Sequence, residues 1–247
     1  TLTEGMSWDW RTFGDYMDRL AERRYTMDVA TQLTHSPLRV FVMGERALRH
    51  EEATADDLEA MYGIVREAMA AGALGFSGGR LVEHRSSTGK HVPGTFAGRD
   101  ELIALARAMG DAGKGVFQMV PKGAVGDFGG HESGRDERIE EHRLYEDIVR
   151  ASGRPLTYSL VQLASDPGDF EMMLERSRAA FASGLRIYPQ VSARGGGLLT
   201  MLDGYHVFLM RPSYREIEHL PVAERARAMR SPERRAAILS ESDVVGD

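Results

Sequence analysis

The chain has 247 residues, of which 42% are hydrophobic and 28% are charged, with a formal net charge of −6 at pH 7. These proportions are typical of a globular protein, and the acidic balance argues against the basic surface that nucleic-acid binding requires. The absence of cysteine excludes disulfides, a thiolate nucleophile and cysteine-ligated zinc within this chain.

Two further features concern location. No apolar run approaches the roughly 18 residues of a membrane span, so we expect no membrane partner. The opening stretch TLTEGMSWDW has neither the cationic start nor the apolar run of a signal peptide. Together with the absence of cysteine, these features favour the reducing cytoplasm.

Hydrophobic periodicity predicts helices and strands that alternate along the chain. We expect helices at 7–24, from Thr54 to Gly72, and at 100–112, 136–152, 167–183, 223–229 and 232–239. We expect strands at 27–33, 73–76, 116–120, 156–163 and 185–191, with a sixth if the apolar segment 38–43 also pairs. Each strand is short and apolar, and most are bounded by glycine, as in parallel sheets covered by helices.

This alternation predicts an α/β fold built from parallel βαβ units. A closed (β/α)8 barrel needs eight strands, and the pattern supplies five or six. We therefore expect a TIM-barrel-like fold that is incomplete in this chain, a single catalytic-barrel fragment over 1–247. Within it we expect a leading helix at 1–24, βα units at 25–197 and a helical insertion or extension at 198–247.

Polar side chains follow the predicted strands, at the end where α/β enzymes place their active sites. The candidates are Gln32, His35, Ser77, Arg80, Gln118, Lys122, Gln162, Gln190, Ser192 and Arg194. The loop after strand 73–76 adds His84 and Arg85. An arginine here offers a planar fork for a substrate carboxylate, although pairing with an acidic neighbour on the rim is an equally simple role. His35 and His84 are candidates to orient substrate, and His35 could equally hydrogen-bond a loop carbonyl.

Other motifs give little support for a different chemistry. None of the eight histidines forms an H-x-H pair or an H-E-x-x-H helix. His131-Glu132 is a candidate metal-binding pair in a glycine-rich loop, whereas the spacing of His142 and Glu146 is common on solvated helix faces. The glycines at 195–197 lack a phosphate-loop pattern, and Ser77 does not lie in a G-x-S-x-G elbow.

Several segments resemble the amidohydrolase superfamily, and within it the N-acyl-D-amino-acid deacylase (D-aminoacylase-like) branch. They are SWDWRTFGDYMDRL, 27–44, AGALGFSGGR, HVPGTFAGRDELIALARAMGDAGKGVFQ, LRIYPQVSARGGG and HVFLMRPSY. The resemblance implies a deformed (β/α)8 barrel in which zinc activates a water molecule to hydrolyse an amide bond. It also implies an aspartate base on the last strand, which we expect beyond Asp247.

The chain departs from this family at the metal site. The family's H-x-H is expected before Thr1, and its metal-binding cysteine is absent. Gln162 lies near the position where the family has a metal-binding histidine, and Gln190 and Arg194 follow strand 185–191. Neutral amides are poor zinc ligands compared with imidazole, so the resemblance assigns no metal ligand within this chain.

Two hypotheses follow. In the first, the full protein is a zinc-dependent hydrolase of N-acyl amino acids: Arg80 and Arg194 bind a carboxylate, His35 and His84 orient substrate, and Gln118, Gln162 and Gln190 lie at the barrel mouth. In the second, the metal ligands have decayed, and the protein binds a small molecule or serves in assembly. This stretch alone is expected to be inactive, because an open barrel exposes two sheet edges, which also predict self-association into a homo-oligomer.

Overall fold

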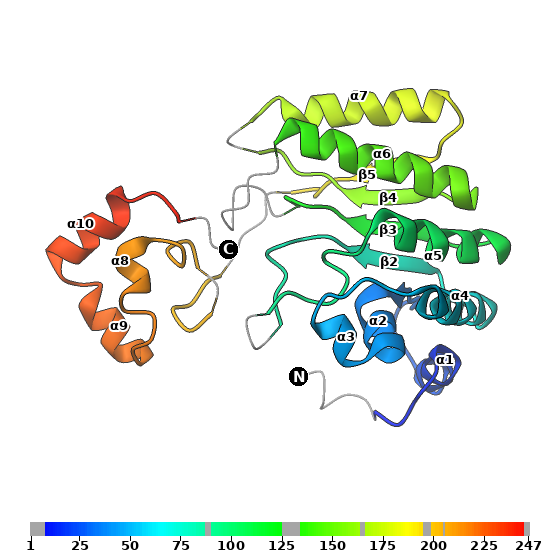
Figure 1. The fold of residues 1–247 in the computed structure, drawn as a ribbon, viewed down its shortest axis with the longest axis horizontal. Helices are drawn as coiled ribbons and strands as arrows, with labels where there is room; N and C mark the ends of the chain where they lie inside the picture. The colour runs from blue at the N-terminus through cyan, green and yellow to red at the C-terminus, as the bar shows by residue number, and fades with distance from the viewer. Residues whose placement is uncertain are drawn as a thin grey trace.

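The computed structural model describes residues 8–86, 90–124, 134–163, 166–194, 199–204 and 206–244. Within these residues, five parallel strands form one sheet, helices pack along it, and a small helical cluster lies on the side toward which the strands point (Figure 1). The strands are β1 (Leu33–Thr34), β2 (Gly75–Gly79), β3 (Val116–Val120), β4 (Leu156–Ser159) and β5 (Ile187–Gln190).

The strand order distinguishes a barrel segment from other α/β folds. The described strands pair in sequence order, β1-β2-β3-β4-β5, and every pair is parallel. Because parallel crossovers are right-handed, strands added in one direction place all connecting helices on the same face. A doubly wound sheet instead reverses its strand order and is covered on both faces. The fold is therefore α/β, with the arrangement of an incomplete (β/α)8 barrel.

Four long helices form the outer layer of this arrangement. They are α4 (Ala55–Ala70), α5 (Arg99–Asp111), α6 (Arg135–Ser152) and α7 (Asp169–Ala182), and each packs against the next. The core lies between this layer and the sheet, where alternate strand residues such as Phe76, Phe117 and Leu156 are fully buried. These four helices agree with the sequence prediction to within one or two residues at each end.

The start of the chain differs from the prediction. The first helix, α1 (Phe13–Ala21), begins only after Thr12, which forms a capping box with Asp15. The segment 27–33 was predicted as a strand, but the strand that forms there is β1, which begins only at Leu33, the last residue of that segment.

The predicted sixth strand at 38–43 is wrong, because this segment lies in helix α2 (His35–Met43), which is followed by α3 (Glu45–Leu48). Its valines suggested a strand, but Leu38 and Met43 are buried on one side of the helix while Phe41 is exposed. Pro37 lies in the first turn, where a missing N–H costs no helical hydrogen bond.

The chain after β5 forms a separate helical cluster. It contains α8 (Pro212–Arg215), α9 (Val222–Ala228) and α10 (Pro232–Ser240), of which the last two were predicted. Its own small core gathers Tyr214, Ile217 and Ile238. Among the described residues, no helix combines the length and apolar character needed to cross a membrane.

Candidate active site at the carboxyl edge of the sheet

The face of the sheet opposite the helices carries a row of polar side chains. Strand pairing aligns Ser77 with Gln118, Gln118 with Thr157, and Thr157 with Tyr188. The Ser77 hydroxyl donates to Gln118 Oε1 at 2.8 Å. Thr157 Oγ1 is shielded from solvent and has no hydrogen-bond partner in the described part of the chain. In a barrel this face lines the interior, and we call these four aligned residues the inner row. Tyr188, on the last described strand, also packs its ring 6.0 Å from that of Phe181 on α7 (Asp169–Ala182).

Only part of this row was predicted from the sequence. Polar residues at or after strand ends were the candidates, which included Ser77 and Gln118 but not Thr157 or Tyr188. Thr157 and Tyr188 lie within their strands, and only the strand register aligns them with Gln118 and Ser77. Alternation within LTYS could have indicated Thr157, because Leu156 and Tyr158 are the apolar members of that strand.

At the end of β1, His35 is part of a buried charge cluster. Its Nε2 lies 2.6 Å from Glu101 Oε1, and the other carboxylate oxygen of Glu101 accepts from Arg39. All three side chains are at most 6% exposed. Burial alone raises the pKa of Glu101, but the hydrogen bonds and charges of His35 and Arg39 outweigh burial and hold this pKa below its ordinary value. His35 therefore links α2 to α5 through Glu101, and its direct contact with substrate stays a prediction.

At the end of β2, Arg80 is engaged with the protein itself. Its Nε lies 2.8 Å from Glu141 Oε1 on α6, and its Nη1 donates to the carbonyl oxygen of Ala97 at 2.7 Å. Burial raises the pKa of Glu141 even though Arg80 opposes the shift, so the carboxylate depends on this partner. The geometry thus favours the role of a paired rim arginine over that of a substrate-binding fork.

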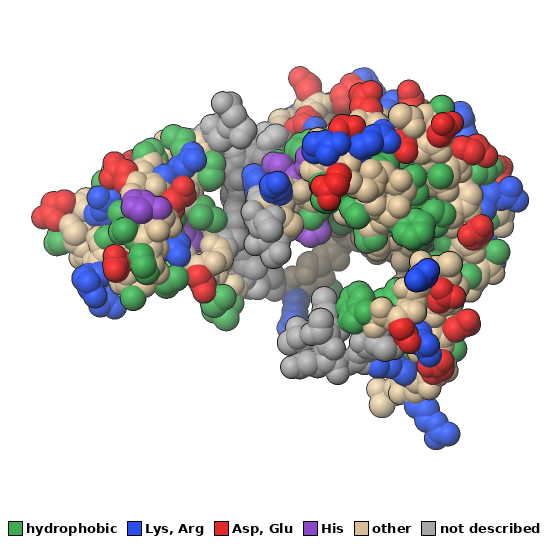
Figure 2. Space-filling view, turned by 60° about the horizontal axis from the view of Figure 1, so that its bottom comes forward, with side chains coloured by type: hydrophobic (Ala, Val, Ile, Leu, Met, Phe, Trp, Pro, Cys, Tyr) green, Lys and Arg blue, Asp and Glu red, His purple; other side chains and the backbone are tan. Residues whose placement is uncertain are grey.

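The loop after β2 brings two further histidines together. The rings of His50 and His91 lie edge to face at 6.3 Å, and both pack against Phe96. His91 Nδ1 donates to the carbonyl oxygen of Val82 at 2.8 Å. Burial lowers the pKa of both imidazoles, which favours their neutral forms. Figure 2 shows histidine side chains on the side of the body that faces the helical cluster.

The remaining predicted residues lie at the rim. His84 is exposed, and only its backbone takes part in the turn with Leu81. Gln162 is exposed and donates to the carbonyl oxygen of Pro167 at 3.2 Å, within its own loop. Gln190 and Arg194 are exposed at and after the end of β5. The structure therefore does not gather the seven predicted residues into one cluster.

The described strand ends do not fit a zinc centre. No group of three His, Asp or Glu side chains that could hold a metal occurs among the described residues. The ends of β2 and β3 instead carry the cations Arg80 and Lys122, and Lys122 is bound by Glu137 at 2.6 Å. The apolar Leu160 follows β4. The candidate pair His131-Glu132 lies outside the described residues.

Comparison with known proteins finds relatives of this fold. No family model matches the sequence. A D-aminoacylase from Alcaligenes xylosoxydans xylosoxydans is 31% identical over 116 residues, which cover 47% of this chain and 21% of that relative. A structure of D-aminoacylase, which has a binuclear metal centre, matches with a TM-score of 0.58 at 23% identity, over 74% of this chain and 34% of that one.

A second enzyme gives a similar match. N-acyl-D-glutamate deacylase from Bordetella bronchiseptica, in complex with zinc and a phosphonate inhibitor, has a TM-score of 0.57 at 20% identity, over the same shares of each chain. The chain spans a minor part of the length of each relative.

The fold is part of an α/β barrel, and it matches the fold of the D-aminoacylase and N-acyl-D-glutamate deacylase structures. D-aminoacylase, whose structure defines a subset of amidohydrolases, resembles the chain both in sequence and in fold. This confirms the family resemblance and the fold class inferred from the sequence.

Proposed function

We propose that this chain forms part of the catalytic barrel of an amidohydrolase that removes the acyl group from N-acyl-D-amino acids. The observation that carries the proposal is the agreement of two likenesses, 31% identity to a D-aminoacylase over 116 residues and a TM-score of 0.58 to a D-aminoacylase structure. Zinc is proposed for the whole protein because the related N-acyl-D-glutamate deacylase binds it. The described residues supply no ligand set for it, so the metal ligands are assigned outside them.

In this proposal the described residues bind and orient the substrate. Ser77 and Gln118 offer a hydroxyl and an amide on the inner face, and Thr157 adds a hydroxyl that lacks a partner in the described structure. Arg194 supplies the carboxylate contact, because it is exposed at the end of β5 while Arg80 is held by Glu141. A guanidinium beside a solvent-accessible strand end binds a carboxylate in two parallel hydrogen bonds.

A second candidate is a protein that binds N-acyl amino acids without metal and without hydrolysis. The observation that favours it is the described set of strand-end residues, where Arg80, Lys122 and Leu160 provide cations and an apolar side chain in place of metal ligands.

We further propose a cytoplasmic location, on the absence of cysteine, and a homo-oligomeric state.

Isothermal titration calorimetry of the whole protein with N-acetyl-D-amino acids separates the two candidates. The titration is made after removal of metal with a chelator and again after addition of zinc. The hydrolase predicts that zinc strengthens binding or produces the heat of turnover. Binding that is equal with and without zinc, with no product, would support the second candidate and contradict the first.

A further inference from the structure

A small pocket lies between α6 and α7, away from the candidate active site. It has a volume of about 250 Å³ and is lined by Glu146, Arg176, Ala179, Ala180 and Ser183. These residues belong to the carboxyl-terminal halves of their helices, or directly follow them, and the helices run opposite to the strands. The pocket therefore lies toward the amino ends of the strands, at the opposite end of the sheet from the carboxyl edge.

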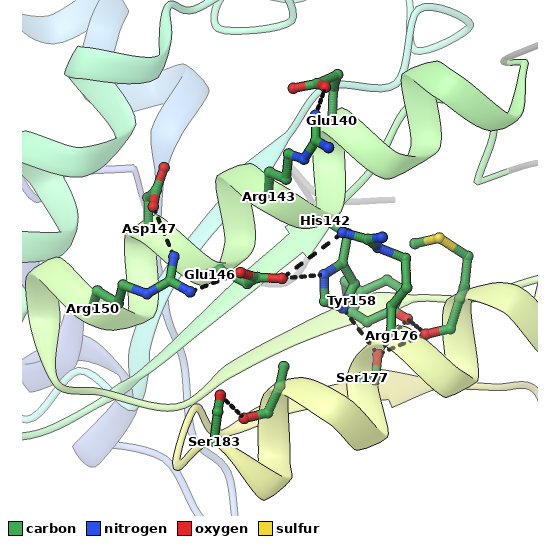
Figure 3. A network of polar contacts seen from close by, with 12 residues as sticks. Glu140, His142, Arg143, Glu146, Asp147, Arg150, Tyr158, Arg176, Ser177 and Ser183 are labelled. Carbon is green, nitrogen blue, oxygen red and sulfur yellow. Dashed lines mark hydrogen bonds and ion pairs between the residues drawn. The ribbon is translucent and has the colours of Figure 1, made fainter.

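Arg176 is the side chain that makes this pocket unusual. Its ion pair with Glu146 Oε1 has an N–O distance of 4.0 Å, and its Nε is shielded from solvent without a hydrogen-bond partner in the described structure. Glu146 already has closer partners, since His142 Nδ1 lies 3.2 Å from one oxygen and Arg150 lies 2.8 Å from the other. Figure 3 shows these side chains around the shared carboxylate of Glu146. The guanidinium of Arg176 thus keeps donors that no described residue uses.

The pocket itself is lined by one guanidinium and one carboxylate, and a small positive excess arises in the ion-pair cluster beside it. The nearby carboxylates are Glu146 and Asp147, and Asp147 is paired with both Arg99 and Arg150. With Arg176, three guanidinium groups meet two carboxylates in the described part of this cluster. A partly desolvated cation gains more from a close counter-charge than an exposed one does, because water screens it less.

We propose that this pocket binds a small monocarboxylate anion through Arg176. A guanidinium binds a carboxylate with two parallel hydrogen bonds, and the methyl groups of Ala179 and Ala180 offer an apolar wall for a short acyl chain. A doubly charged phosphate is disfavoured, because Glu146 lines the same pocket and repels the second charge. The pocket is open to solvent and is larger than a short carboxylic acid, so it admits propionate or butyrate without selecting for their size. This proposal does not depend on the proposed catalytic function.

A buried network provides an internal reporter for occupancy. His142 is fully buried, and its Nε2 lies 3.3 Å from the hydroxyl of Ser177, which is 2.9 Å from the hydroxyl of Tyr158 on β4. Burial lowers the pKa of His142, and the charge of Arg176 lowers it further, while Glu146 opposes them. An anion on Arg176 offsets part of its charge, so binding raises the pKa of His142.

The test is a titration of the whole protein with sodium propionate at constant ionic strength, followed by NMR of the His142 ring. The key variant is Arg176→Gln. Its matched control is Arg178→Gln, on the same helix, whose arginine is 73% exposed and lies 3.6 Å from Glu175. We expect saturable binding in the wild type and in the control, at least tenfold weaker binding in Arg176→Gln, and an upward shift of the His142 pKa on binding.

Equal affinity in Arg176→Gln and Arg178→Gln would overturn the proposal, as would a response that sodium chloride reproduces. Tighter binding of inorganic phosphate than of propionate would overturn the assignment to a monocarboxylate. If Arg176→Gln does not fold, Arg176→Lys keeps the charge and removes the planar fork, and we expect it to weaken propionate binding severalfold. If propionate changes NMR chemical shifts in the wild type but not those of residues in α6 and α7, the proposed site is wrong whatever the variants show.

Discussion

Two arginines at strand ends differ in what each is free to do. Arg80 bonds to Glu141 and to the carbonyl oxygen of Ala97, whereas Arg194 is exposed after β5. We predict that Arg194→Ala in the whole protein raises KM for an N-acyl amino acid about tenfold or more, because losing a charged hydrogen bond to the substrate costs about 1.5–3 kcal/mol of binding free energy. The free energy of unfolding should change little, because the Arg194 side chain is exposed. Steady-state kinetics and thermal unfolding measure both effects.

The contrasting variant is Arg80→Ala. It leaves Glu141 buried without its partner, so we predict a loss of about 3–5 kcal/mol in the free energy of unfolding. An unchanged KM in Arg194→Ala would remove that residue from the substrate site. Full stability in Arg80→Ala would show that the Glu141 pair is not structural.

The buried cluster of His35, Arg39 and Glu101 gives a pH-dependent prediction. Because the pKa of Glu101 is lower in the folded than in the unfolded chain, its ionisation stabilises the fold above the ordinary glutamate pKa of 4.5. This stability is lost as the pH falls through the lower, folded value. We predict that Glu101→Gln costs about 3–5 kcal/mol at pH 7, where it leaves Arg39 without a carboxylate.

Urea unfolding of the wild type and of Glu101→Gln at several pH values tests the direction of this pH dependence. The stability gap between them should narrow as the pH falls below 4.5. A gap that stays constant down to acidic pH would mean that Glu101 does not titrate differently in the folded state.

At the scale of elements, the close approach of β2 and β3 depends on one glycine. A methyl group added to Gly75 would overlap the backbone of Val116, whereas one added to Gly79, in the same strand, meets nothing within 4 Å. We predict that Gly75→Ala lowers the free energy of unfolding by about 1–3 kcal/mol or more, because overpacking typically costs about that much. Gly79→Ala, the matched control, should change stability by less than about 1 kcal/mol. If the two variants lose the same free energy of unfolding in chemical denaturation, the close approach of β2 and β3 at Gly75 does not contribute to stability.

The elements show how far the sequence determines local structure. A helix was predicted to begin at Thr54, and Thr54 is the N-cap of α4 and forms a capping box with Asp57. The segment 38–43 misled, because β-branched residues favour strands in general while here the burial of Leu38 and Met43 on one side decides for helix α2. Local preference was overridden by packing that depends on residues far along the chain.

The site was less predictable than the elements for a physical reason. Position after a strand identified Arg80 and His35 as site candidates, but their partners Glu141 and Glu101 lie 61 and 66 residues further on, on separate helices. No spacing in the sequence indicates such pairs. The inner row likewise depends on register, which aligns Gln118 with Thr157 only once the sheet has formed.

At the scale of the whole molecule, the described sheet is covered by helices on one face and carries the polar inner row on the other. This asymmetry is typical of a barrel wall, whose second face looks into an enclosed site. The charges at the described strand ends are balanced by α6, through Glu141 for Arg80 and Glu137 for Lys122. The paired cations are thus held in place, and in the proposed function the exposed Arg194 and the inner row meet the substrate.

The central claim is that the protein containing this chain hydrolyses N-acyl-D-amino acids. The most direct test is a steady-state assay for release of the free amino acid from N-acetyl-D and N-acetyl-L substrates, first after treatment with a chelator and then after addition of zinc. The account predicts turnover of D substrates that zinc restores, with little turnover of the L forms. Absence of turnover for every substrate with every metal tested, in a protein that is folded, would contradict it.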